Sequence, residues 1–141
     1  MSIFVDTGVF YAQQHEAAGR HDVATDALRE MLTGRFGTIY TSDYVHDEAV
    51  TLVRARTGQY GAAKRVSERI LGDESPISLL YVGKRRLRES LETFERYSDQ
   101  ELSFTDTTTV TLVGLHDIDS VLSFDDDFDG VIERTDPPEI A

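Results

Sequence analysis

The sequence predicts a single α/β domain over residues 1–141, with a central, mainly parallel β-sheet flanked by α-helices. Short apolar runs typical of buried strands alternate with longer segments whose apolar residues recur at helical spacing. Connections of this kind bring successive strands into a parallel sheet and place helices on its faces. No internal repeat, linker or low-complexity segment divides the chain, and 141 residues is the size of one domain.

The first expected strand spans residues 2–5, where an apolar run precedes the turn-forming sequence Asp-Thr-Gly. A helix is expected to start near Val9. The segment from Asp22 has apolar residues at 23, 24, 27, 28, 31 and 32, which mark one face of a second helix. Asp22 is its expected N-cap and Gly34 its expected stop.

The next expected strand spans residues 38–41. Ser42 or Asp43 is expected to cap a helix that runs to about Thr57 and ends at Gly58. The rest of the chain continues the alternation of helices and strands. Its expected helices are 61–71, 83–97 and 105–115, and its expected strands are 77–82, 120–124 and 130–133, the last around Val131 and Ile132.

Four acidic residues lie at the boundary of an apolar segment or on a helix that follows one. They are Asp6, Glu48, Asp106 and Asp125. In open α/β folds, ligands bind at the edge where the strands end. Carboxylates that meet there repel one another unless a cation or protons intervene. The placement therefore predicts a divalent metal site.

Each of these acids also has a purely structural interpretation. Asp6 and Asp106 suit the N-caps of the helices that follow them, and one residue can serve both roles. Glu48 lies in the first half of its helix, where acidic residues favour the helix dipole. Asp126 or Asp127 can take the place of Asp125, because the three aspartates are consecutive.

Four segments together resemble the PIN domain, the nuclease fold of many prokaryotic toxins of the VapC type. They are FVDTGVFYA, TSDYVHDEAVTLVRAR, FTDTTTV and VLSFDDDFDG, and the resemblance spans nearly the whole chain. It implies a ribonuclease that depends on Mg²⁺ or Mn²⁺ and hydrolyses RNA phosphodiester bonds. It also implies that the protein is the toxin of a toxin–antitoxin pair and is usually dimeric.

The resemblance assigns catalytic roles to Asp6, Glu48, Asp106 and Asp125, with Asp6, Asp106 and Asp125 as metal ligands. Magnesium prefers oxygen ligands and retains several waters, so two or three carboxylates suffice. Three neighbours are further candidates, namely Asp127, Thr7 and Thr107. The chain departs from the family pattern in its triple aspartate and in its overall acidity.

The expected partners are an RNA substrate, a cognate antitoxin whose positive side chain enters the acidic cleft, and a second copy of the chain. The apolar residues of 44–53 and 62–71 are the expected dimer surface.

A free-standing RNA-processing nuclease and a catalytically inactive PIN-like binding module are the alternatives to a toxin ribonuclease. A receiver domain is disfavoured because no lysine follows residue 84, and a haloacid-dehalogenase-type phosphatase because Gly8 replaces the second aspartate of its first motif.

The composition limits which ligands, chemistry and cellular locations are expected for the protein. The formal net charge of −12 argues against broad duplex binding through a basic face and resembles proteins of salt-loving organisms. The absence of cysteine excludes thiolate chemistry and fits a cytoplasmic location. No apolar run spans a membrane, and the first residues do not form a signal peptide. The arginines at 54, 56, 65 and 69 are expected on solvated helix faces, with RNA or partner contact as the alternative.

Overall fold

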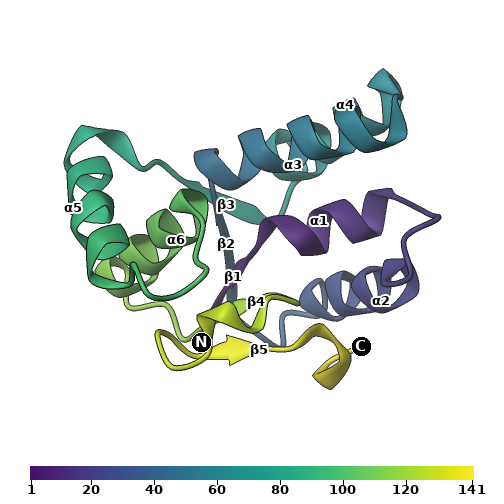
Figure 1. The fold of residues 1–141 in the computed structure, drawn as a ribbon. Coiled ribbons are helices and arrows are strands. Elements are labelled where there is room, and N and C mark those ends of the chain that lie inside the picture. The colour runs from purple at the N-terminus through teal and green to yellow at the C-terminus, as the bar shows by residue number, and fades with distance from the viewer.

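The computed structural model describes all residues from 1 to 141 as a five-stranded sheet with helices on both faces (Figure 1). In chain order, the elements are β1 (Ser2–Val5), α1 (Thr7–Gln14), α2 (His21–Met31), β2 (Thr38–Ser42), α3 (Asp43–Thr57), α4 (Tyr60–Leu71), β3 (Ile77–Leu80), α5 (Gly83–Arg96), α6 (Phe104–Leu115), β4 (Ser120–Leu122), the 3₁₀ helix η1 (Asp126–Phe128), β5 (Arg134–Thr135) and the 3₁₀ helix η2 (Pro137–Glu139). No helix is long and apolar enough to cross a membrane.

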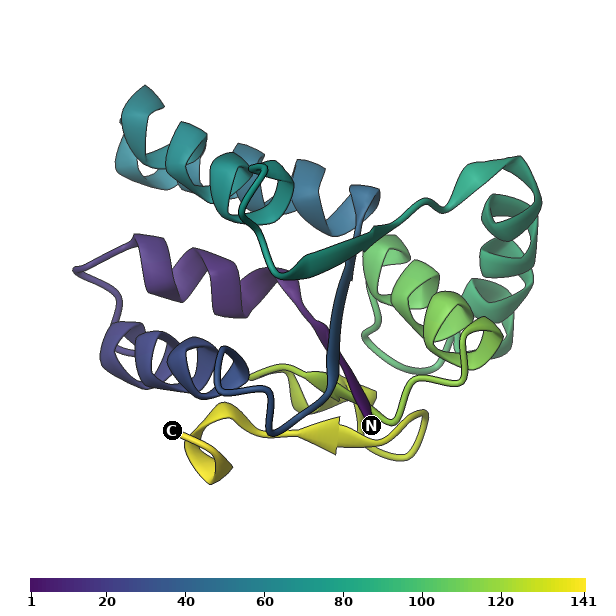
Figure 2. The ribbon, with the colours of Figure 1, turned by 180° about the vertical axis from the view of Figure 1, so that it is seen from behind.

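The sheet is parallel throughout, with the strand order β3-β2-β1-β4-β5. The chain builds β1, β2 and β3 outward in one direction and then crosses to β4 on the other side of β1. Figures 1 and 2 show α1 to α4 on one side of the sheet and the pair α5 and α6 on the other. The direction of winding therefore reverses between β1 and β4, the position where open α/β sheets bind ligands.

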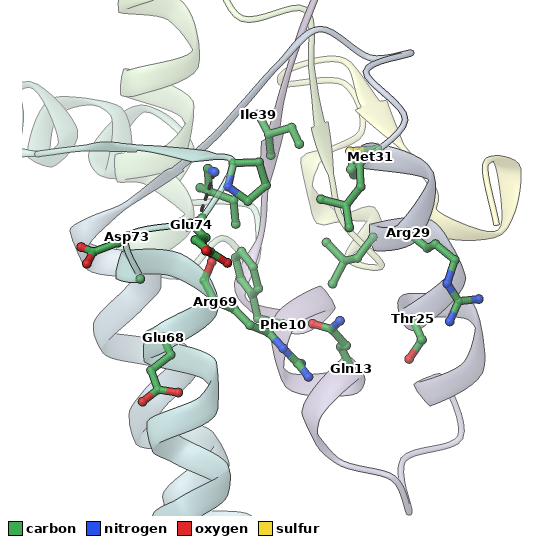
Figure 3. A pocket seen from close by; sticks show the side chains of 16 residues that line it. Phe10, Gln13, Thr25, Arg29, Met31, Ile39, Glu68, Arg69, Asp73 and Glu74 are labelled. Carbon is green, nitrogen blue, oxygen red and sulfur yellow. Dashed lines mark hydrogen bonds between the residues drawn. The ribbon is translucent and has the colours of Figure 1, made fainter.

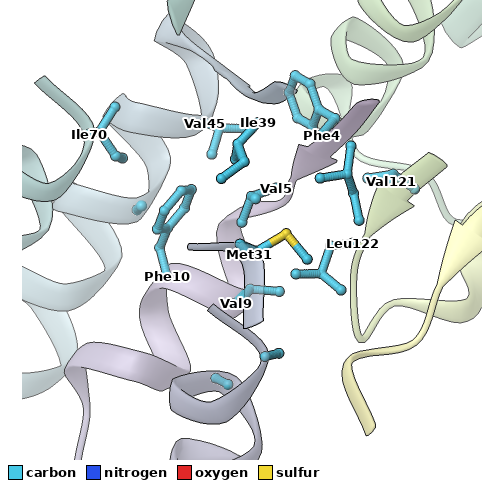
Figure 4. Close-up of a cluster of buried hydrophobic side chains, with 14 of the residues drawn as sticks. Phe4, Val5, Val9, Phe10, Met31, Ile39, Val45, Ile70, Val121 and Leu122 are labelled. Atoms are coloured by element: carbon cyan, nitrogen blue, oxygen red, sulfur yellow. The ribbon is translucent and has the colours of Figure 1, made fainter. Parts of the chain in front are cut away.

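The core lies mainly between the sheet and helices α1 to α4 (Figure 4). Three successive residues of β1 are buried, Ile3, Phe4 and Val5. Neighbouring residues of a strand point to opposite faces, so burial of all three requires cover on both sides of the sheet. Phe10 of α1 and Ile70 of α4 extend the core away from the strands. The central strand that leads into the first acidic residue is thus buried on both faces of the sheet.

Helix α3 begins and ends as the sequence predicts. The Ser42 hydroxyl accepts a hydrogen bond from the Val45 amide at 3.1 Å, which satisfies one of the free donors of the first turn. Gly58 ends the helix in the left-handed conformation, with φ of 68°. That conformation costs glycine little because it has no Cβ. Glu48 is consequently held at a defined height along the helix, two turns before its end.

Two local predictions are wrong. The last strand is Arg134–Thr135, whereas the amides of Val131 and Ile132 bond the Phe128 carbonyl and close a turn after η1. Asp22 is not an N-cap, because α2 already begins at His21. The His21 ring contacts the Ala12 carbonyl at 3.0 Å, a tertiary contact that the local sequence does not reveal.

Most apolar side chains of α3 and α4, the helices of the expected dimer surface, are buried, among them Val45, Val53, Val66 and Ile70. Helical periodicity indicates an apolar face but does not tell whether the same chain covers it. Here α1 lies against both helices. Leu71 at the end of α4 is exposed, as are Tyr81, Leu91 and Phe94 on and beside α5. Dimerisation itself stays a prediction.

Candidate metal centre

The two central parallel strands place the first acidic residue at the point where the winding of the sheet reverses. Val5 of β1 pairs with Leu122 of β4, so the residues that follow them, Asp6 and Ser123, are neighbours. The Asp6 amide donates to the Leu122 carbonyl at 3.1 Å, and the Ser123 hydroxyl donates to Asp6 Oδ2 at 2.6 Å. Asp6 occupies the N-cap position of α1, but its side chain makes no capping hydrogen bond. Its carboxylate is therefore turned toward the strand ends rather than used to start the helix.

Asp106 is brought to the same place by the start of α6. The Ser103 hydroxyl accepts from the Asp106 amide at 3.1 Å, while Asp106 Oδ2 accepts from the Ser103 amide at 3.0 Å. This reciprocal pair is a capping box, so the helix-capping interpretation of Asp106 holds. The box fixes one carboxylate oxygen and leaves the other free of a side-chain donor.

Asp125 follows β4 and is held by the loop around it. Its amide donates to the Ser123 hydroxyl at 3.0 Å, and its Oδ1 accepts from the Asp127 amide at 2.9 Å. Ser123 therefore connects Asp6 and Asp125 through a single hydroxyl. The sequence prediction missed Ser123, although a small hydroxyl residue directly after a buried strand is a recognisable signal.

Electrostatic coupling shows that these acids are near one another. The pKa of Asp6 is raised to about 7, mainly by burial; the charges of Asp106 and Glu48 add to the rise and the Ser123 hydrogen bond opposes it. Burial likewise raises the pKa of Asp106 to about 6, with added effects of Asp125 and Glu48. Asp6 and Asp106 are only 6% and 8% exposed. Two desolvated carboxyl groups among further acids are unfavourable as anions unless a cation joins them.

The additional candidates differ in what they contact. The Thr7 hydroxyl is buried beside Asp6 without a hydrogen-bond partner. The Thr107 hydroxyl donates to the Phe104 carbonyl at 2.7 Å and is used within α6. Asp127 is half-buried, and the charge of Asp125 raises its pKa. Oxygen atoms of Asp125, Asp126 and Asp127 lie within 4.8 Å of one another, which forms a second, more exposed acidic group beside the first.

The donor set fits a hard divalent cation such as Mg²⁺ or Mn²⁺. All candidate ligands are carboxylate oxygens, which such cations prefer. Asp6, Asp106 and Asp125 each use one oxygen for a hydrogen bond from the chain and keep the other free of a side-chain donor. Groups that are hydrogen-bonded on one side are already oriented for a ligand on the other. The partnerless Thr7 hydroxyl adds an unused polar atom at the same place.

One cavity lies away from the acidic residues, and none of the four acids lines it. It is a groove of about 730 Å³ between α1, α2, α4 and the start of β3 (Figure 3). Figure 3 shows Phe10 and Gln13 of α1 on one side and Glu68 and Arg69 of α4 on another. Its lining combines apolar and charged side chains. The groove is therefore separate from the acidic residues at the strand ends.

Comparison with known proteins finds a matching family and similar structures over nearly the whole chain. Residues 3–133 match the family model described as PIN domain. The structure is similar to VapC20 of Mycobacterium tuberculosis, described as a sarcin-ricin-loop-cleaving toxin, with 26% identity, a TM-score of 0.79 and coverage of 93% of this chain and 97% of that one. FitAcB from Neisseria gonorrhoeae has the same fold at 15% identity, with a TM-score of 0.67 and coverage of 96% and 97%. None of the curated proteins matches the chain.

Proposed function

The chain belongs to the PIN domain family, and from that membership we propose that it is a divalent-metal-dependent endoribonuclease, the toxin of a toxin–antitoxin pair. The observation that carries the proposal is the meeting of Asp6, Glu48, Asp106 and Asp125 from four separate parts of the chain. Their charges couple in a buried position at the reversal of the sheet. The similarity to a toxin that cleaves RNA supports the choice of substrate.

In this proposal, Asp6, Asp106 and Asp125 hold Mg²⁺ or Mn²⁺, and Glu48 orients the attacking water. When bound, the cation would polarise a phosphate oxygen, lower the pKa of a bound water and stabilise the leaving oxygen. Ser123 and Ser103 keep the Asp6 and Asp106 carboxylates in place through the bonds at 2.6 and 3.0 Å. Thr7 offers a hydroxyl donor to a phosphate oxygen.

Cleavage of RNA by the purified protein tests the proposal. We expect cleavage with Mg²⁺ or Mn²⁺, loss of cleavage after exhaustive chelation, and recovery when either ion is restored. A free-standing processing nuclease would behave in the same way, but its expression would not arrest growth. Activity that survives chelation would contradict the metal site, and a folded protein without activity toward any RNA would favour the binding-module alternative.

An antitoxin is the expected protein partner, and the groove between α1, α2 and α4 supports this choice. The groove follows α1, the helix that begins next to Asp6, so a helix lying in it can carry a positive side chain toward the acidic cleft. We expect the product of an adjacent short reading frame to copurify with the chain and to suppress cleavage. Leu28→Arg, which places a charge in the groove, should abolish copurification without loss of cleavage. Copurification and inhibition unaffected by that substitution would exclude the groove.

A second copy of the chain is the other expected partner, and α5 provides a self-complementary surface. Basic residues fill its first half, at Lys84, Arg85 and Arg88, and the acids Glu92 and Glu95 follow. Two copies of α5 in antiparallel contact bring unlike charges together around the exposed side chain of Leu91.

We expect this dimer to strengthen as salt rises. Each chain carries a net charge of −12, and surface ion pairs return only about 1 kcal/mol or less each. Raising salt from about 0.01 M to 1 M shortens the screening length from roughly 30 Å to 3 Å. Mass measurement across that range should show more dimer at high salt. Leu91→Glu should abolish the dimer, whereas Leu32→Glu, an exposed leucine on another surface, should not; a monomer at every salt concentration would disprove the interface.

A further inference from the structure

Two arginines are stacked on aromatic rings that belong to the segments carrying Asp6 and Asp125. The Arg20 guanidinium lies 4.7 Å from the centre of the Phe124 ring, and the Arg56 guanidinium lies 5.5 Å from that of Tyr11. Both arginines are exposed, both rings are half-buried, and neither arginine forms a salt bridge. Stacking thus holds each guanidinium in place while its N–H donors remain available.

The strand order places the two pairs on opposite sides of α1. Tyr11 lies on α1 itself, about 7.5 Å along the helix axis from Asp6. Arg56 reaches it from α3, the helix that follows β2 and carries Glu48. Phe124 reaches the site from the other side, because it follows β4 and lies between Ser123 and Asp125 in the chain.

Two similar pairs elsewhere show that stacking alone does not indicate a binding site. Arg35 lies 5.1 Å from the Phe36 ring, but it also forms a 3.5 Å ion pair with Glu30. Arg54 lies 5.9 Å from the exposed ring of Tyr60, at the start of α4. Neither Phe36 nor Tyr60 is close in the chain to any of the four acids. The rings of the Arg20 and Arg56 pairs differ in this respect, because Phe124 directly precedes Asp125 and Tyr11 lies on the helix that follows Asp6.

On the basis of the proposed ribonuclease function, we propose that the Arg20–Phe124 and Arg56–Tyr11 pairs form a clamp for unpaired RNA next to the scissile phosphate. A chain of net charge −12 needs local cations to hold a polyanion, and a fixed guanidinium binds phosphate through two parallel hydrogen bonds. Aromatic and guanidinium planes stack on bases only where the bases are splayed out of a helix. The substrate class is therefore RNA with a single-stranded or loop segment at the cleavage site.

Binding measurements on Asp6→Asn protein, which retains RNA without cleaving it, test the clamp. The probes are a fluorescent hairpin RNA pool with a randomised loop and a fully paired duplex pool. We expect the hairpins to bind more tightly, and Arg20→Ala with Arg56→Ala to weaken that binding about tenfold or more. Loss of two phosphate contacts should also reduce the slope of log affinity against log salt by about 1.4.

Two matched double variants separate the clamp from general charge effects. Arg35→Ala with Arg54→Ala removes the same charge from the two pairs that lie elsewhere and should leave binding unchanged. Arg20→Lys with Arg56→Lys keeps the positive charges but removes the planar guanidinium groups. This variant should retain the slope of log affinity against log salt and lose the tighter binding of hairpins over duplexes. Equal losses in both alanine variants, or equal binding of hairpin and duplex, would overturn the clamp. If either of these results is found while the wild-type protein still cleaves RNA, the clamp is wrong and the proposed ribonuclease function stands. If the wild-type protein neither cleaves nor binds any RNA, the proposed function is wrong as well.

Discussion

Asp6→Asn and Asp106→Asn are each expected to lower RNA cleavage at least about 10²- to 10³-fold, the scale of losing one group that stabilises transition-state charge. Asparagine preserves the size of the side chain and can still accept the hydrogen bond of Ser123 or Ser103. The substitution removes the negative charge that a divalent cation requires. Cleavage of a defined RNA under single-turnover conditions measures the effect directly.

The matched control for these variants is Asp47→Asn. Asp47 is exposed on α3 and precedes Glu48 in the chain. Its substitution by asparagine removes one negative charge, as the other two substitutions do, but leaves the buried acids unchanged. We expect it to cleave as the wild-type chain does. Circular dichroism should show that all three variants are folded. If Asp6→Asn and Asp106→Asn both retain full cleavage, the acidic cluster is not the catalytic centre.

The metal-free protein is expected to lose stability as pH rises from about 4 to 7, relative to Asp6→Asn. The pKa of Asp6 is about 7 in the folded chain, against an ordinary value of 3.8. Between these values, the folded state holds a proton that the unfolded state has released, so the free energy of unfolding falls as pH rises. The shift sets an upper bound on the order of 4 kcal/mol for this contribution above pH 7. Asp106, with a pKa of about 6, contributes in the same direction.

Urea unfolding in the presence of chelator, at pH 5 and pH 8, checks this expectation. Asp6→Asn should be more stable than wild type at pH 8, and the difference should shrink at pH 5. Mn²⁺ should reverse the order at pH 8, because the cation binds the folded wild-type site and competes with protons there. A difference between the two proteins that does not vary with pH would show that Asp6 is not a buried, charge-strained acid.

The strands and helices that position the site were predictable because local patterns specify them. The apolar run ending at Val5 and the hydroxyl cap at Ser42 required no knowledge of the rest of the chain. The short C-terminal strand was not predictable, because Val131 and Ile132 are apolar but close a turn onto Phe128. Which apolar helix faces are covered also depends on tertiary packing, so helical periodicity did not reveal that most apolar side chains of α3 and α4 are buried.

The sequence predicts the main residues of the candidate site but not their supports. Acidic residues at the boundaries of apolar segments led to the prediction of Asp6, Asp106 and Asp125. Their meeting depends on β1 and β4 being neighbours, which the sequence of elements leaves open. The contacts of Ser123 with Asp6 and of Arg20 with Phe124 join segments more than 100 residues apart, and Arg56 reaches Tyr11 from a different helix. Periodicity within a segment carries no information about such contacts.

Crystals soaked in Mn²⁺ provide the most direct test of the central claim, because anomalous scattering locates the ion without assuming its ligands. The account predicts an anomalous peak between the carboxylates of Asp6, Asp106 and Asp125, and its loss in Asp6→Asn crystals. A peak only at the exposed group formed by Asp125, Asp126 and Asp127, unchanged by Asp6→Asn, would contradict it.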